Sequence, residues 1–173
     1  MKHILAVAGT VLLAACSHDV RTPVALDTLV VPNQAPWLIL GAGPEQVEVK
    51  GLDQSVKLLP EPPLAKALEA QLRAAVQKDY FTNLTIACDG PKVELRGGDE
   101  DAPDAVRLGL SLHCTINARG YVSTHDYQAS ASTSVPAGSD GAAYARALVM
   151  LLRDGAGQIA AKLGPDVRDS RPK

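Results

Sequence analysis

The chain has 173 residues, of which 17 are lysine or arginine and 19 are aspartate or glutamate, and its formal net charge is −2. The two signs are interspersed along the sequence, so the basic stripe typical of nucleic-acid binding is missing and nucleic acid is excluded as an expected partner. The length is enough for one domain with a substantial core but not comfortably for two.

The first sixteen residues have the order of a bacterial secretion signal. Lys2 is followed by the apolar residues 4–13 and then by the small residues Ala14 and Ala15, as in a cleaved signal peptide. The apolar stretch is far shorter than the ~20 residues of a membrane-spanning helix. Residues 13–16, Leu-Ala-Ala-Cys, resemble the lipobox of bacterial lipoproteins. This resemblance implies a signal peptide over residues 1–15, cleavage before Cys16 and lipid on Cys16. The alternative is a secreted protein in which Cys16 is incidental.

A lipid on Cys16 would determine where the protein works. Each buried CH₂ contributes ~0.8 kcal/mol, so several acyl chains hold a protein to a bilayer almost permanently. Removing Lys2 with the signal changes the formal charge from −2 to −3. By resemblance to the lipoprotein class, Ser17 in place of aspartate after the cysteine implies the outer membrane, with the domain facing the periplasm.

Two further cysteines, Cys88 and Cys114, remain in a compartment that permits disulfides. One intramolecular bridge between them is therefore the simplest prediction. Neither cysteine belongs to a C-x-x-C motif or to a cysteine–histidine spacing typical of zinc sites, so we expect no metal and no redox role.

Prolines dominate the start of the mature chain. Because Pro23, Pro32 and Pro36 restrict the backbone and remove donors, residues 16–36 are predicted to form the lipidated N-terminus and an extended tether. A single domain is expected over residues 37–164, beginning with short strands near residues 37–40 and 47–50. Residues 165–173 are expected to be a flexible tail.

Two amphipathic helices are predicted. The first follows the proline pair at residues 62–63 and runs to about Lys78, and the second starts at Ser139 or Asp140 and ends before Pro165. Gly155 and Gly157 in the second helix predict a kink or a close approach to a sheet. The expected buried stripes are Leu64, Leu68, Leu72 and Val76 in the first helix, and Tyr144, Leu148, Leu152, Ile159 and Leu163 in the second.

Strict alternation of apolar and polar residues predicts the strands between the helices. Residues 83–88 and 92–95 are short candidates, and residues 97–104 are expected to form a solvated loop. Residues 106–118 and 121–133 alternate most clearly, and the turn at Arg119 and Gly120 should make them an antiparallel hairpin. Both Cys88 and Cys114 have the apolar parity, so their sulfurs are expected in the core. The fold class is therefore α+β: two helices cover one face of a mainly antiparallel sheet, and the other face is polar and open.

The layout resembles the YajG family of small outer-membrane lipoproteins. The resemblance rests on the lipobox, the proline-containing lead-in, the long hairpin and the closing helix, with residues 126–130, Asp-Tyr-Gln-Ala-Ser, as the closest local match. The cysteine pair departs from that family. The resemblance implies a location and a fold rather than a chemistry.

Catalysis is not expected. His113 and His125, with Ser111, Ser123 and Asp126, raise the possibility of a triad, but Asp126 has the opposite parity to His125 and no serine lies on a nucleophile elbow. Residues 97–104 lack the ligand spacing of a calcium loop, and residues 41–43, Gly-Ala-Gly, lack the third glycine of a dinucleotide fingerprint. We therefore expect no enzyme, no cofactor and no metal.

The sequence favours a non-enzymatic, membrane-anchored lipoprotein that binds a protein or envelope component, as an assembly or auxiliary factor. The candidate binding face on the polar side of the sheet comprises Arg107, His113, Asn117 and Arg119. An alternative is a periplasmic immunity or inhibitor lipoprotein that neutralises a toxic hydrolase. A third is an anchored hydrolase that uses His113 and His125.

Overall fold

The computed structural model describes residues 19–30, 36–99 and 102–170. Cys16 and the predicted signal peptide lie outside these residues. The elements are β1 (Val20–Ala25), η1 (Asp27–Leu29), β2 (Leu38–Leu40), β3 (Val47–Lys50), β4 (Val56–Glu61), α1 (Leu64–Val76), η2 (Gln77–Asp79), β5 (Leu84–Cys88), β6 (Lys92–Asp99), β7 (Ala102–Ala118), β8 (Tyr121–Ser134) and α2 (Gly141–Asp169).

The strands form one sheet in the order β1-β4-β3-β6-β7-β5-β2. The long strand β7 pairs with β8 along one side and with β6 and then β5 along the other. Three pairings are parallel, namely β1–β4, β2–β5 and β3–β6. The sheet is therefore mixed, and the prediction of a mainly antiparallel sheet is wrong. Alternation identifies a strand but carries no information on the direction of a distant partner.

The predicted tether over residues 16–36 is corrected by β1. Val20–Ala25 pairs with β4, and the following Leu26 and Leu29 are fully buried. Pro23 is tolerated because β1 is an edge strand, where a missing N–H breaks no ladder bond on the outer side. The folded domain thus begins at Val20 rather than at residue 37.

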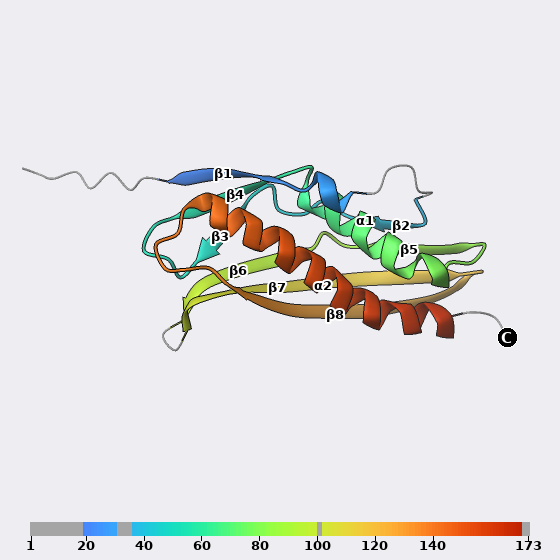
Figure 1. Ribbon diagram of the computed structural model, residues 1–173. Helices are drawn as coiled ribbons and strands as arrows, with labels where there is room; N and C mark the ends of the chain where they lie inside the picture. Colours follow the sequence, from blue (N-terminus) through green and yellow to red (C-terminus); the bar gives the residue numbers. More distant parts are fainter. Residues whose placement is uncertain (1–18, 31–35, 100–101, 171–173) are drawn as a thin grey trace, which may run out of the picture.

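Both helices pack on one face of the sheet (Figure 1). All the residues predicted for the two buried stripes are buried, which confirms them. At Gly155 an added Cβ would lie 3.4 Å from Leu110 Cδ2, so the predicted close approach to the sheet is also confirmed. The N-terminal cap is Asp140, whose Oδ1 accepts from Ala143 N at 3.0 Å.

The end of α2 differs from the prediction. The helix continues through Pro165 to Asp169, although proline removes one helical hydrogen bond. Three contacts explain the extension: Val167 is fully buried, Asp166 Oδ2 accepts from Tyr127 Oη at 2.7 Å, and Arg168 Nη1 lies 3.1 Å from Asp79 Oδ1. Residues 165–169 are thus part of the domain rather than of a tail.

The predicted hairpin is confirmed by β7 and β8, which pair from Ala105↔Ser134 to Ala118↔Tyr121. The predicted loop over residues 97–104 is wrong at both ends, since β6 extends to Asp99 and β7 starts at Ala102. The predicted bridge is present: Cys88 and Cys114 are register partners in β5 and β7 and form a disulfide.

Two edges of the sheet are covered by side chains from the helices. On β2, Leu40 N donates to Glu69 Oε2 at 3.1 Å and Leu38 O accepts from Arg73 Nη2 at 3.1 Å. On β8, the amide of Gln158 bonds both the N–H and the carbonyl of Ser130. These side chains occupy backbone groups that would otherwise be open to pairing with another strand.

Candidate functional site

The face of the sheet opposite the helices is the candidate site. Along β7, one parity is buried beneath the helices, and Arg107, His113 and Asn117 on the other parity are exposed on the open face. Arg119 lies in the turn after β7 with a φ of 53°, beyond the end of that row. Ten residues separate Arg107 from Asn117, so they lie about 33 Å apart along the strand. The predicted residues therefore share a surface but do not form one compact site.

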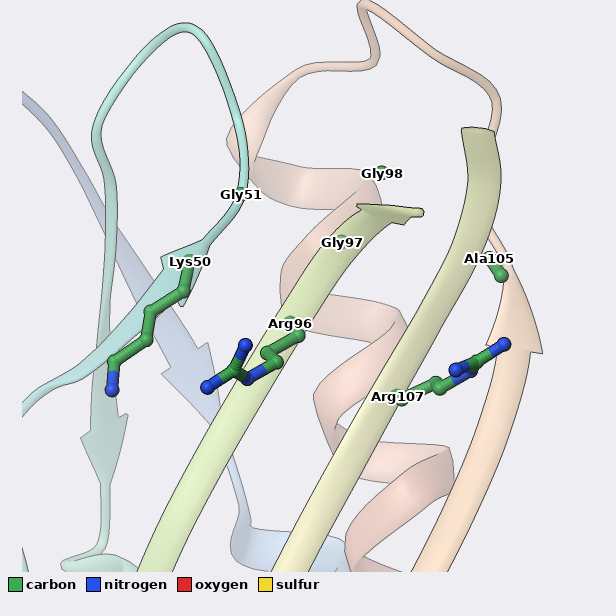
Figure 2. A pocket seen from close by; sticks show the side chains of 7 residues that line it. All are labelled: Lys50, Gly51, Arg96, Gly97, Gly98, Ala105 and Arg107. Carbon is green, nitrogen blue, oxygen red and sulfur yellow. The ribbon is translucent and has the colours of Figure 1, made fainter. Parts of the chain in front are cut away.

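Cations gather at the end of the open face where β6 finishes and β7 begins. The register places Lys50 of β3 beside Arg96 of β6, and Arg96 beside Arg107 of β7. These three side chains line a pocket of about 260 Å³, together with Gly51, Gly97, Gly98 and Ala105. Figure 2 shows Arg96 extending toward Lys50, whereas Arg107 extends the other way, toward Ala105. We call Lys50, Arg96 and Arg107 the cationic row.

Glu94 is the counter-ion of two members of the row. Its Oε1 accepts from Lys50 Nζ at 3.0 Å, from Arg96 Nε at 3.0 Å and from Arg96 Nη2 at 2.8 Å. The hydrogen bonds from Lys50 and Arg96 lower the pKa of Glu94, so this exposed carboxylate stays ionised. A lysine ammonium has three N–H donors and a guanidinium has five, so both cations keep donors beyond those that Glu94 occupies.

Glycines form the wall of this pocket because the backbone there leaves no space for a side chain. Gly51 has a φ of +84°, and a Cβ on it would lie 2.4 Å from Gly97 O. Gly98 has a φ of +71°, which L-residues rarely adopt. The end of β3 therefore approaches the end of β6 through backbone atoms.

His113 is paired across the hairpin with Asp126. His113 Nδ1 lies 2.7 Å from Asp126 Oδ1, and this hydrogen bond raises the pKa of the imidazole. Both side chains are exposed, so the pair marks the middle of the open face with an imidazole whose protonated form Asp126 stabilises.

Beyond His113, the open face is uncharged. The register of β2, β5, β7 and β8 places seven side chains there in two rows across the strands. The first row is Ile39, Ala87, Thr115 and Thr124, and the second row is Thr85, Asn117 and Val122. Ile39 is 47% exposed and Val122 is 57% exposed. We call these seven residues the uncharged patch. The open face thus changes along β7 from cationic at one end to neutral at the other.

Ser123, His125 and Asp166 are brought together on the helix side of the hairpin. Ser123 Oγ lies 3.0 Å from His125 Nε2, and His125 Nδ1 lies 3.4 Å from Asp166 Oδ2. This is the order of a hydrolase triad, and the sequence did not predict it because residue 166 falls in the segment expected to be a flexible tail. However, the same Oδ2 accepts the shorter bond from Tyr127, and Ser123 lies within a paired strand rather than on the sharp turn that exposes a nucleophile. We interpret these contacts as the attachment of the end of α2 to the hairpin.

Within the described residues, no group of three or more histidine, cysteine, aspartate or glutamate side chains is arranged to hold a metal ion. None of the helices in this part of the chain has the length and apolar character needed to cross a bilayer.

No protein-family model matches the sequence, and no curated protein matches it. Solved structures do share the fold. A protein from Caulobacter crescentus CB15, provisionally named a lipoprotein, is 14% identical with a TM-score of 0.52 over 79% of this chain and 93% of its own. Protein XCC0632 from Xanthomonas campestris, of the DUF330 family, is 14% identical with a TM-score of 0.50 over 83% of this chain and 98% of its own. An uncharacterized protein is 16% identical with a TM-score of 0.50 over 86% of this chain and 99% of its own. At these identities the likeness shows the fold alone, so the chain has a fold that is also found in a bacterial protein named as a lipoprotein.

Proposed function

We propose that the protein is an outer-membrane lipoprotein, anchored by acyl chains on Cys16 and facing the periplasm, that binds a protein or another envelope component through the open face of its sheet and catalyses no reaction. The observation that carries the proposal is the open face itself. Two helices cover one face of the sheet, while the other face presents exposed side chains over the length of β7.

The anchor is supported by the leader. Residues 13–16 resemble a lipobox, and a protein that shares the fold is named as a lipoprotein. Membership of the YajG family and sorting to the outer membrane through Ser17 belong to the same proposal. A Cys16→Ala variant should lose lipid, as judged by mass spectrometry, and should leave the membrane fraction.

Binding is supported by the uncharged patch. Exposed branched side chains such as Ile39 and Val122 are cheaper to desolvate than charged ones. The centre of protein interfaces is likewise depleted in charge. We therefore expect the partner to contact the end of the hairpin that carries Asn117 and Val122.

In-cell crosslinking tests this expectation. A photoreactive amino acid at Thr115 or Asn117 should capture the partner, whereas the same residue at Arg153, which is exposed on α2, should not. Capture of an envelope assembly component would support the auxiliary role, and capture of a secreted hydrolase as the dominant partner would favour the immunity or inhibitor role. Equal capture from Arg153 and Asn117, or none from either in cells with a functional protein, would refute binding through this face. Full complementation by a variant lacking both His113 and His125 would argue against the hydrolase hypothesis.

A further inference from the structure

We infer that the partner docks by adding an extended strand to the outer edge of β8, over residues 122–126. The inference rests on the proposed function, since it names the kind of segment that the partner presents to this end of the hairpin. Such docking needs outward backbone groups that no other part of the fold occupies, and side chains beside them that tolerate burial.

The contacts of α2 show which backbone groups of β8 face outward, away from β7. Ser130 N donates to Gln158 Oε1 at 3.2 Å, and Gln158 Nε2 donates to Ser130 O at 2.9 Å. Gln128 O accepts from Lys162 Nζ. Backbone groups of successive residues in a strand point to opposite edges, so every second residue counted from Ser130 faces the same way. Three residues near the start of β8 share this direction: Val122, Thr124 and Asp126.

The start of this edge is uncovered. Figure 1 shows α2 running obliquely over the sheet to β8, and its side chains bond the edge at Gln128 and Ser130. In the part of the chain that the structure describes, no side chain bonds the outward N–H and carbonyl groups of residues 122–126. The Gln158 amide makes with Ser130 the same pair of bonds that a residue of another strand would make. An open stretch of about 14 Å therefore remains for a partner strand.

The other edges of the sheet are protected against pairing. On β2, Glu69 and Arg73 occupy outward backbone groups, and β1 carries Pro23, which has no N–H to donate. Proteins commonly block their edges in these ways, because an open edge next to exposed apolar side chains pairs with other chains. At the start of β8, Tyr121 is 69% exposed and Val122 is 57% exposed. This contrast between the edges favours a partner strand at residues 122–126.

The side chains beside the edge indicate which strand fits. Val122 and Thr124 lie on the open face, and their cross-strand neighbours Asn117 and Thr115 are also uncharged. Apolar or β-branched residues of an added strand would pair well with them. Asp126, at the end of the stretch, is already bonded to His113. The partner therefore presents an extended segment of about five residues that turns uncharged side chains toward the uncharged patch.

Mapping of crosslinks in cells tests the inference on the lipidated protein. A photoreactive amino acid replaces Val122 or Asp126, and mass spectrometry identifies the crosslinked residue of the captured partner. A paired strand advances residue for residue along β8. The two positions should therefore capture partner residues about four apart within one segment.

A pair of proline variants tests the role of the backbone. Thr124→Pro removes an outward N–H that the ladder with β7 does not use, a change that edge strands tolerate. Capture from Asn117 should fall by about tenfold, because a carbonyl of the partner loses its donor. Ser132→Pro makes the same change farther along the edge, beside Arg107, and should leave capture within about twofold of wild type.

Three results would overturn strand addition while the proposed function stands. These are partner sites without the expected spacing, an equal effect of the two proline variants, and capture from Asn117 with none from Val122 or Asp126. A lack of capture from Asn117 itself would refute the proposed function and this inference together. Should Thr124→Pro fail to show the wild-type thermal transition, the spacing of the crosslinked partner residues decides, since it requires no proline variant.

Discussion

The buried ion pair between Glu69 and Arg73 gives the sharpest stability prediction. Both residues are 7% exposed, and they bond each other one helical turn apart on α1. Glu69 also accepts from Leu40 N, and Arg73 donates to Leu38 O. The pair therefore has two roles: it neutralises two buried charges and it satisfies the outer edge of β2.

Removing one partner should be far more damaging than removing an exposed carboxylate. Glu69→Ala leaves the buried Arg73 without its carboxylate and Leu40 N without its acceptor. Breaking a buried pair in this way destabilises a protein by about 3–5 kcal/mol, which is a large part of the 5–15 kcal/mol typical of a domain. Glu69→Gln should have a smaller effect, because its amide oxygen can still accept from Leu40 N.

Urea unfolding of the disulfide-intact protein measures this loss, with Trp37 as the reporter. Trp37 is the single tryptophan of the chain, is 6% exposed and precedes β2. Glu45→Ala, at an exposed position, is the matched control and should lie within about 0.5 kcal/mol of wild type. A double-mutant cycle with Arg73→Ala should give a coupling energy above about 1 kcal/mol. A loss below about 1 kcal/mol for Glu69→Ala, equal to that of the control, would refute the argument.

Three further predictions concern other parts of the fold. Replacing both Cys88 and Cys114 by alanine should lower the free energy of unfolding by about 3–4 kcal/mol, because the bridge closes a loop with a sequence separation of 26. Chemical denaturation measures this loss of stability, and a loss below about 1 kcal/mol would contradict the prediction. Gly51→Ala should destabilise the protein by at least about 1–2 kcal/mol in thermal melts, because it forces a positive φ and a clash with Gly97 O. Gly109→Ala, whose Cβ would meet nothing closer than 3.9 Å, is its control. Asp126 raises the pKa of His113, so the stability that this pair adds to the fold is fully present below the ordinary pKa of histidine and is lost as the pH rises through the raised value. Asp126→Asn should bring the pKa of His113 back toward its ordinary value in an NMR titration. An unchanged titration would rule out the pairing.

Local patterns predicted those features that depend on one element at a time. The stripe from Leu64 to Val76, the cap at Asp140 and the alternation in β7 each need only the periodicity of a helix or a strand. The disulfide followed from the two cysteines left in a compartment that permits bridges, and the shared apolar parity of Cys88 and Cys114 placed both sulfurs in the core. These predictions are confirmed.

Prolines account for two differences between the predicted and the observed elements, because proline favours a break in a strand or a helix. Pro23 lies on the outer strand β1, where its missing N–H breaks no ladder bond on the open side. Pro165 is accommodated because packing of Val167 holds the last turns of α2 in place. In each case a tertiary contact outweighs a local penalty that the sequence shows clearly.

The candidate site was predicted only in part, because its geometry depends on pairing between distant segments. Parity along β7 located Arg107, His113 and Asn117 on the open face. The parallel pairing of β3 with β6 brings Lys50 to Arg96, and no local pattern reports that partner. Asp166 was likewise missed as a neighbour of His125, because the contact requires α2 to extend past Pro165.

The length of β7 and the position of the proposed anchor together determine how far the uncharged patch would lie from the membrane. A strand of 17 residues spans about 56 Å. In Figure 1, β7 begins at the end of the sheet where β1 begins, and its last residues and the turn into β8 lie at the other end. If Cys16 fixes the first end at the bilayer, the uncharged patch stands several tens of ångströms from the lipid surface, beyond the ~8 Å over which headgroup charge acts at physiological ionic strength.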